Sequence, residues 1–281
     1  MQIKKVGVCG AGTMGRGIAQ LLAMNGTEVI LYDAISEAIT NSKKHIEENL
    51  VNLANKGKID SSSIGKISAL IHYTNDFNDC KADLFIEAIK EDIDLKIELF
   101  NNLAKQNEKS CILASNTSSL SITAIAKQLK HPENFVGLHF FNPPTLMKLV
   151  ELVSTNWSDK KIVHAVKSFI EKTGKTIVEC HDAPGFIVNR VARPFYIESL
   201  RMIEEGAGNY AQIDQLLEAT GFKMGPFKLM DLIGNDVNFS VSCSIYEQLQ
   251  QTERLKPSYI QQQLVREGKW GKKSNEGYYT Y

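Results

Sequence analysis

The first two-thirds of the chain alternates short apolar runs with longer stretches in which apolar residues recur at helical spacing. Short apolar runs are typical of buried strands, and the longer stretches are typical of amphipathic helices. The predicted strands cover residues 3–9, 28–32, 84–86, 111–114, 135–138, 148–153 and 176–178. The predicted helices cover residues 14–25, 36–57, 92–106, 121–129 and 159–173, with a short piece around residues 64–67. This alternation predicts an α/β fold whose mostly parallel sheet is covered by helices on both faces.

The pattern changes around Pro184-Gly185, a dipeptide that is typical of a turn between domains. Beyond it no strand pattern occurs, and the predicted helices cover residues 186–205, 210–220, 235–251 and 257–267. Residues 271–279 are predicted to form an irregular loop. We therefore divide the chain into an α/β domain, residues 1–182, and an all-helical C-terminal domain, residues 183–281.

Composition narrows the class of protein. Lys and Arg number 32, as do Asp and Glu, so there is no excess of positive charge of the kind that binds nucleic acid. No run approaches the roughly 20 apolar residues of a membrane span, so no membrane association is expected. The chain enters its first strand almost at once, which leaves no room for a targeting segment and predicts a cytoplasmic protein. The five cysteines are odd in number, lack a C-x-x-C pair and fit a reducing compartment; no metal site is expected.

The first strand is followed by the turn Gly10-Ala11-Gly12-Thr13-Met14-Gly15. In a dinucleotide-binding turn, the first glycine permits the tight bend, the second admits a pyrophosphate and the third lets helix and strand pack closely. Backbone N–H groups at the start of the helix, at Thr13 and Met14, would face the phosphates. A glycine turn alone could be purely structural, but the strand, the helix and a second strand all agree here. The turn predicts a Rossmann-type domain.

Asp33 closes the second predicted strand, about 20 residues after the turn. A carboxylate here can accept hydrogen bonds from a ribose hydroxyl and would repel a 2′-phosphate. The residues that follow, Ala34-Ile35-Ser36, supply no arginine for such a phosphate. The sequence therefore favours NAD over NADP as the cofactor.

Two titratable residues stand out at later predicted strands, one inside a strand and one directly after a strand. Glu151 interrupts the apolar run Leu149–Val153, and a carboxylate buried in a strand needs a cationic or hydrogen-bonding partner. His139 follows the preceding predicted strand and could be that partner. A Glu–His pair orients the imidazole and stabilises its protonated form, as a hydroxyl dehydrogenase requires. A purely structural His–Glu pair remains the alternative.

Other polar residues allow two interpretations. Residues 115–119, Ser-Asn-Thr-Ser-Ser, follow a predicted strand, where they could cap a helix or contact a ligand. Asn189 stands in an apolar helical stretch and either faces solvent or turns toward a cleft. Lys56 ends the second predicted helix, where a lysine is favoured by the helix dipole without any further role.

Taken together, the motifs resemble the short-chain L-3-hydroxyacyl-CoA dehydrogenases, and among them most closely the bacterial 3-hydroxybutyryl-CoA dehydrogenases. The stretches that carry the resemblance span nearly the whole chain, at residues 10–15, 86–89, 114–120, 137–143, 147–151, 184–190 and 224–226.

The resemblance implies a role for each matching residue. His139 is similar to the catalytic base and Glu151 to its orienting carboxylate, with Ser118 and Asn189 at the substrate oxygen. Lys56 matches a lysine that contacts CoA, and Asn49 stands where relatives have a CoA-contacting serine. The implied cofactor contacts are Asp33, Glu91, Lys96, Asn116, Ser118, Asn142 and Lys273, together with the glycine turn. The resemblance also implies an acyl-CoA substrate and a homodimer formed through the helical domain.

The sequence thus predicts an NAD-dependent 3-hydroxyacyl-CoA dehydrogenase, acting on 3-hydroxybutyryl-CoA and acetoacetyl-CoA. Two alternatives remain open. One is a dehydrogenase of a free hydroxy acid or sugar acid on the same scaffold. The other is a non-catalytic NAD-binding protein, which would have no need of a buried acid–base pair.

Overall fold

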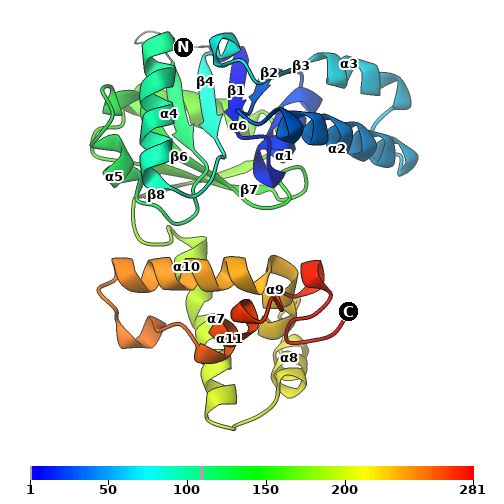
Figure 1. The fold of residues 1–281 in the computed structure, drawn as a ribbon, viewed down its shortest axis with the longest axis vertical. Helices are drawn as coiled ribbons and strands as arrows, with labels where there is room; N and C mark the ends of the chain where they lie inside the picture. The colour runs from blue at the N-terminus through cyan, green and yellow to red at the C-terminus, as the bar shows by residue number, and fades with distance from the viewer. Residues whose placement is uncertain (1, 108–110) are drawn as a thin grey trace. The chain divides into compact units, whose positions relative to one another are not determined.

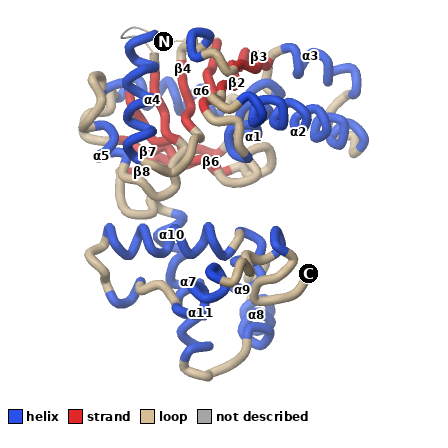
Figure 2. The backbone as a smooth tube through the Cα atoms, in the orientation of Figure 1, coloured by secondary structure: helices blue, strands red, loops and turns tan. Residues whose placement is uncertain are grey.

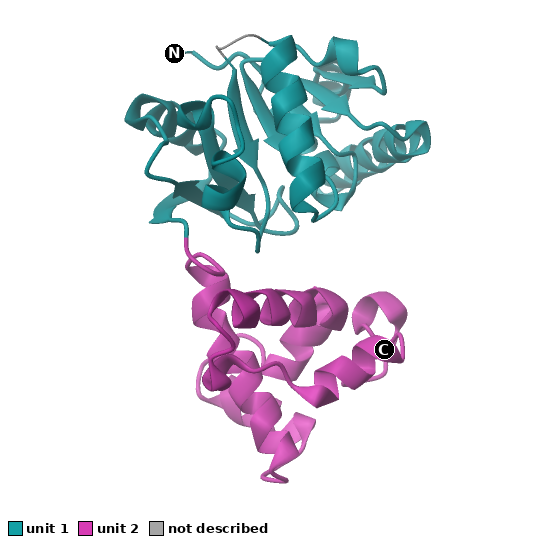
Figure 3. Cartoon of the chain, turned by 60° about the vertical axis from the view of Figure 1, so that its left-hand side comes forward, with its two compact units in different colours: residues 1–182 teal, residues 183–281 magenta. Residues whose placement is uncertain are grey.

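The computed structural model describes residues 2–107 and 111–281. The chain divides into two compact units, residues 1–182 and 183–281 (Figure 3). Strands occupy the first unit, whereas the second is built from helices and loops (Figure 2). Within the described ranges, no helix combines the length and apolar character that crossing a membrane would require.

The first unit is built on one eight-stranded sheet in the order β3-β2-β1-β4-β5-β6-β7-β8 (Figure 1). The first six strands are parallel, β7 is antiparallel to β6, and β8 is parallel to β7. The order reverses between β1 and β4, and ligands in such sheets bind beyond the carboxyl ends of strands at this reversal. The strands are β1 Lys5–Cys9, β2 Glu28–Tyr32, β3 Ile71–Thr74, β4 Leu84–Glu87, β5 Ile112–Ser115, β6 Phe135–Phe140, β7 Leu149–Ser154 and β8 Thr176–His181.

Helices cover both faces of this sheet. On one face, helices α1, α2, α3 and α6 join the strands in an apolar cluster that includes Val8, Leu22 and Val166. On the other face, Phe100 of α4 packs edge-on against Phe135 of β6, with ring centroids 5.0 Å apart. The helices are α1 Thr13–Met24, α2 Ser36–Asn55, α3 Ile64–Ala69, α4 Ile93–Gln106, α5 Ile122–Ala126 and α6 Lys160–Glu171.

The second unit packs its helices around an aromatic cluster. Its helices are α7 Val188–Glu204, α8 Tyr210–Ala219, α9 Pro226–Ile233, α10 Asn235–Gln248 and α11 Tyr259–Arg266. Phe227 and Tyr278 lie in the cluster with ring centroids 5.0 Å apart, beside Tyr196 and Met230. The predicted fold class is confirmed: a Rossmann-type, mostly parallel sheet followed by an all-helical C-terminal unit.

Several predictions of local structure were wrong. Strand β3 was not predicted, because its four residues, Ile71–Thr74, are half polar and form the sheet edge. Helix α9 was not predicted; it begins at Pro226, and proline in the first turn of a helix is favourable. Strands β6 and β8 are longer than predicted, since neighbouring strands supply pairing that apolar patterning alone does not reveal.

The C-terminal tail is also more ordered than predicted. Backbone bridges join Gly271 to Glu276 and Glu276 to Thr280. The buried carboxylate of Asp231 accepts the backbone N–H of Tyr278 and of Tyr279, both at 3.0 Å. These bonds attach the tail to α9, a long-range constraint that local sequence does not reveal.

Candidate active site

The glycine turn connects β1 to α1 and leaves space over its middle residue. Gly10 has φ +104, and a Cβ there or at Gly15 would collide with backbone carbonyl groups. A Cβ on Gly12 would meet nothing within 4 Å. Gly12 is the N-cap of α1, so open space lies at the positive end of the helix dipole. This cradle fits a pyrophosphate.

Asp33, directly after β2, is fixed against this turn. Its Oδ2 accepts the Ala11 N–H at 2.8 Å and its Oδ1 accepts the Ile35 N–H at 3.0 Å. Thr13 and Met14 are the first two residues of α1. The glycine turn, the start of α1 and Asp33 thus lie together at the carboxyl edge of β1 and β2.

His139 and Glu151 face each other on adjacent antiparallel strands. They are register partners in β6 and β7, and the imidazole Nδ1 lies 2.8 Å from Glu151 Oε2. The side chains are 7% and 1% exposed. The prediction that β6 ends before His139 was wrong: the strand continues to Phe140, which holds His139 in the ladder.

Alternation along the strands decides which face carries this pair. Leu138 and Leu152 belong to the apolar cluster under α1 and α6, so His139 and Glu151 point to the opposite face. Gly137, two residues before His139 on β6, lies on this same opposite face, and a Cβ there would strike Ile122 of α5. The His139–Glu151 pair is therefore on the face that carries α5. A buried carboxylate at Nδ1 leaves Nε2 as the imidazole atom suited to exchange a proton with a ligand.

An ion-pair cluster lies at the ends of β4 and β5. From the sequence, Glu91 and Lys96 of this cluster were expected to contact the cofactor. Lys96 Nζ is 2.5 Å from Glu87 Oε1 and 3.1 Å from Glu91 Oε2, and its side chain is 1% exposed. Glu87 also accepts the Ser115 hydroxyl at 2.7 Å and the Ile89 N–H at 2.8 Å. Glu87 was given no role from the sequence; its position at the end of an apolar strand was the available signal.

This cluster holds the loop that carries Ser118. Burial alone would raise the pKa of Glu91, but the Lys96 ammonium and hydroxyl donors outweigh it and lower that pKa. Glu91 accepts the Thr117 hydroxyl and, at 3.1 Å, the Ser119 hydroxyl. Ser118 stands between these two anchored residues, half-buried, in the loop that leads to α5. Glu91, paired with Lys96, thus anchors the residues on both sides of Ser118.

Asn116 links the ends of β5 and β6. Its Oδ1 accepts the backbone N–H of Phe140 at 2.9 Å. The side chain that was expected to contact the cofactor therefore also braces the strand end next to His139.

A groove of about 400 Å³ contains Asn49 and Asn142. We call it the α1–α2 groove; its lining residues are Thr13, Arg16, Gly17, Gln20, His45, Ile46, Glu48, Asn49, Asn52, Asn142, Pro143, Pro144 and Thr145. Asn49 donates a hydrogen bond to Gln20 Oε1 at 2.9 Å. Lys56 is the exposed C-cap of α2 and does not line the groove.

Two predicted site residues belong to the second unit. Asn189 is the second residue of α7, and its carbonyl oxygen accepts a hydrogen bond from Arg193 Nε at 3.2 Å. Lys273 Nζ pairs with both carboxylate oxygens of Asp236, at 2.6 and 2.7 Å.

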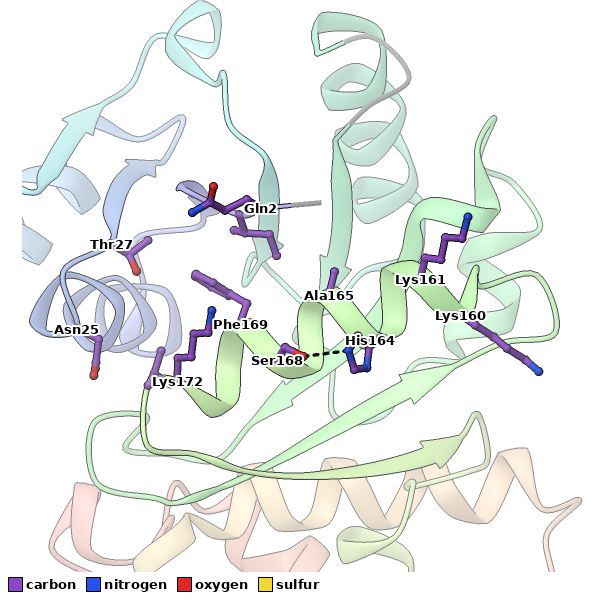
Figure 4. Close-up of a pocket in the computed structure, with 12 residues that line it drawn as sticks. Gln2, Asn25, Thr27, Lys160, Lys161, His164, Ala165, Ser168, Phe169 and Lys172 are labelled. Carbon is purple, nitrogen blue, oxygen red and sulfur yellow. Dashed lines mark hydrogen bonds between the residues drawn. The ribbon is translucent and has the colours of Figure 1, made fainter.

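A larger cavity, about 740 Å³, lies elsewhere on the first unit (Figure 4). It is lined by one side of α6 and by residues just before β1 and β2, including Ile3 and Thr27. It therefore opens at the amino ends of these strands, away from the edge where such sheets bind ligands. Among residues 2–107 and 111–281, no cluster of three His, Cys, Asp or Glu could hold a metal ion.

Comparisons with known proteins agree with this geometry. Residues 5–183 match the family model "3-hydroxyacyl-CoA dehydrogenase, NAD binding domain", and residues 185–281 match its C-terminal domain. The chain is 44% identical to 3-hydroxyadipyl-CoA dehydrogenase of Escherichia coli K12, over 100% of this chain but only 60% of that relative. It is 37% identical to a probable 3-hydroxybutyryl-CoA dehydrogenase of Deinococcus radiodurans, covering 99% of this chain and 100% of the relative. The crystal structure of M. tuberculosis FadB2 superposes over 100% of both chains, with a TM-score of 0.97 and 35% identity.

Proposed function

The chain belongs to the 3-hydroxyacyl-CoA dehydrogenase family, and we propose that it interconverts (S)-3-hydroxybutyryl-CoA and acetoacetyl-CoA. As a member of this family it is an NAD-dependent oxidoreductase. The observation that carries the proposal is the buried His139–Glu151 pair, joined at 2.8 Å. Such a pair has a use in proton transfer from a hydroxyl and none in passive dinucleotide binding.

The fit to NAD rests on the open space over Gly12 and on Asp33 beside the turn. When bound, NAD supplies the hydride acceptor for oxidation and the hydride donor for reduction. The turn and the start of α1 would hold the pyrophosphate, and Asp33 would accept a hydrogen bond from a ribose hydroxyl.

His139 Nε2 would take the proton of the substrate hydroxyl in oxidation and return it in reduction. Glu151, 1% exposed, holds the imidazole by Nδ1 and stabilises its cationic form. Ser118 and Asn189 are proposed to donate hydrogen bonds to the substrate oxygen. Lys56 and Asn49 are proposed to contact the CoA moiety.

The test follows NADH consumption with acetoacetyl-CoA in wild type and His139→Gln. We expect the substitution to lower kcat by about 10²–10⁴-fold while NADH still binds. His164→Gln, an exposed histidine of α6, is the matched control and should keep the wild-type rate. A near wild-type rate for His139→Gln would overturn the mechanism.

The same assay separates the alternatives. A free-acid dehydrogenase would reduce acetoacetate as well as acetoacetyl-CoA and would be indifferent to Lys56→Ala. A non-catalytic protein would bind NADH without consuming it. Because one relative is a 3-hydroxyadipyl-CoA dehydrogenase, 3-oxoadipyl-CoA belongs in the substrate panel. Equal rates with NADH and NADPH would contradict the role of Asp33.

Two further predictions concern the whole protein. The helical unit is proposed to form a homodimer, and it leaves several large apolar side chains exposed, among them Val191 at 72% and Leu216 at 63%. Sedimentation of the purified protein measures this directly. The prediction of a cytoplasmic location rests on the sequence alone.

A further inference from the structure

The α1–α2 groove carries one cation without a partner. Arg16 is half-buried and lines the groove. Among the residues that the structure describes, its guanidinium has neither a hydrogen bond nor a carboxylate within 4 Å. An arginine is poorly suited to that state, since its planar group has five donors and prefers to bind carboxylate or phosphate through two of them.

The groove around Arg16 is firmly built. Thr13, Arg16, Gly17 and Gln20 recur at helical spacing and form one side of α1. The opposite side of the groove is formed by the loop that contains Pro144. This loop can approach α1 closely because residue 17 is glycine: a Cβ there would lie 2.8 Å from the Pro144 ring.

The loop that contains Pro144 is held in place by hydrogen bonds from Lys175. Lys175, 8% exposed, donates to the carbonyl of Pro144 at 2.5 Å and to that of Met147 at 2.6 Å. These two hydrogen bonds fix the loop of residues 142–147 beside α1, so the groove does not depend on a mobile segment.

The charges in the groove favour an anion at Arg16. Of its lining residues only Glu48 is acidic. The Glu48 carboxylate pairs with Lys44 at 3.9 Å and is more than 4 Å from the Arg16 guanidinium. The other polar groups are hydroxyls and amides such as Thr13 and Asn52, which donate readily to phosphate oxygens, and the imidazole of His45, whose Nδ1 lies 2.7 Å from the Asn41 carbonyl oxygen. Asn49, proposed above as a CoA contact, lines the same groove.

We propose that Arg16 binds a phosphate group of CoA and thereby selects CoA thioesters over carriers that lack the nucleotide. This inference rests on the proposed acyl-CoA substrate. It adds a specificity-determining residue on α1 to the contacts proposed on α2, and it places a phosphate of CoA in the α1–α2 groove.

The experiment measures equilibrium binding by calorimetry, so that it does not depend on turnover. The probes are CoA, 3′-dephospho-CoA and pantetheine, each titrated into wild type, Arg16→Gln and Arg16→Lys. We expect Arg16→Gln to weaken CoA binding about three- to tenfold. This loss lies near the upper end of what an exposed ion pair contributes and just below what a hydrogen bond to a charged group contributes. Pantetheine, which has no phosphate, should bind both proteins equally. Arg16→Lys should fall between them, because lysine keeps the charge but not the fork of donors.

Lys43→Gln is the matched control, since Lys43 is an exposed cation of α2 that does not line the groove. It should leave CoA binding unchanged. Dephospho-CoA identifies the phosphate: the Arg16→Gln effect persists if the pyrophosphate is bound and disappears if the 3′-phosphate is bound.

Two results would overturn the inference. One is an equal loss of pantetheine and CoA affinity, which would mean that the groove itself was damaged. The other is weakened NADH binding with unchanged CoA binding, which would assign Arg16 to the dinucleotide instead. Failure of the proposed function is a separate result: wild type would then bind CoA in an Arg16-dependent way but would not reduce acetoacetyl-CoA.

Discussion

Replacing Lys96 by methionine should destabilise the first unit severely. The substitution keeps most of the side-chain volume but removes an ammonium that is 1% exposed and lies between two carboxylates. Glu87, 0% exposed, would then be a buried charge without its cation. Breaking a buried ion pair in this way costs about 3–5 kcal/mol. The Ser115 hydroxyl and the Ile89 N–H still hydrogen-bond Glu87, which favours the lower end of that range.

Urea unfolding measures this loss. The chain has two tryptophans, Trp157 in the first unit and Trp270 in the second, so a Trp270→Phe background lets fluorescence report the first unit alone. With a slope of about 2 kcal/mol per molar urea, the midpoint should fall by about 1.5–2.5 M. Lys167→Met is the matched control: its 2.7 Å pair with Glu179 is exposed and should contribute only about 0.2–1 kcal/mol.

The pH dependence tests the cause. Burial raises the pKa of Glu87 above its ordinary value, although Lys96 opposes this shift. The folded protein therefore holds this proton more readily than the unfolded chain, and the stability that ionised Glu87 removes is recovered as the pH falls through its raised pKa. Without Lys96 the pKa rises further, so the gap between Lys96→Met and wild type should narrow on acidification.

A second substitution isolates the charge. Glu87→Gln introduced into Lys96→Met removes the unpaired carboxylate and should restore at least half of the lost stability. A stability loss for Lys96→Met no larger than that for Lys167→Met, or a double variant as unstable as the single one, would contradict a buried ion pair between Lys96 and Glu87.

Three other predictions, made with four substitutions, test separate parts of the structure. Glu151→Gln should lower kcat for acetoacetyl-CoA reduction by about 10²–10⁴-fold with NADH binding retained, because the amide cannot stabilise an imidazolium; an unchanged kcat would contradict the pair. Gly15→Ala should lower the melting temperature because its Cβ strikes a backbone carbonyl, whereas Gly12→Ala should fold normally and weaken NADH binding by filling open space; calorimetry and NADH titration separate the two, and the reverse pattern would refute this assignment. Tyr279→Phe should destabilise the second unit by about 1–3 kcal/mol, because its hydroxyl donates at 2.7 Å to the buried Asp214 carboxylate; denaturation followed by Trp270 fluorescence measures the loss, and an unchanged midpoint would show that this bond is dispensable.

Local sequence was sufficient for the elements that carry their own signals. The glycine turn, its flanking strands and Asp33 could be predicted together, because each backbone or charge requirement is met by residues close in the chain. The out-of-place Glu151 signalled a buried partner, since an apolar strand tolerates a carboxylate only if it is paired. The resemblance in motifs then pointed to the family that the comparisons establish.

Tertiary structure decided what depends on residues far apart in the chain. Only the antiparallel pairing of β6 with β7 brings His139 opposite Glu151, and only strand alternation assigns them to the face of α5. Glu87 accepts the hydroxyl of Ser115, which is 28 residues away, because β4 pairs with β5, and no local pattern states this contact. The groove beside Arg16 exists because a loop more than 120 residues away lies on Gly17. The sequence by itself determined the type of site, because the motifs that define it are short and local. The fold determined the geometry of the site, because that geometry depends on contacts between strands and loops that are distant in the chain.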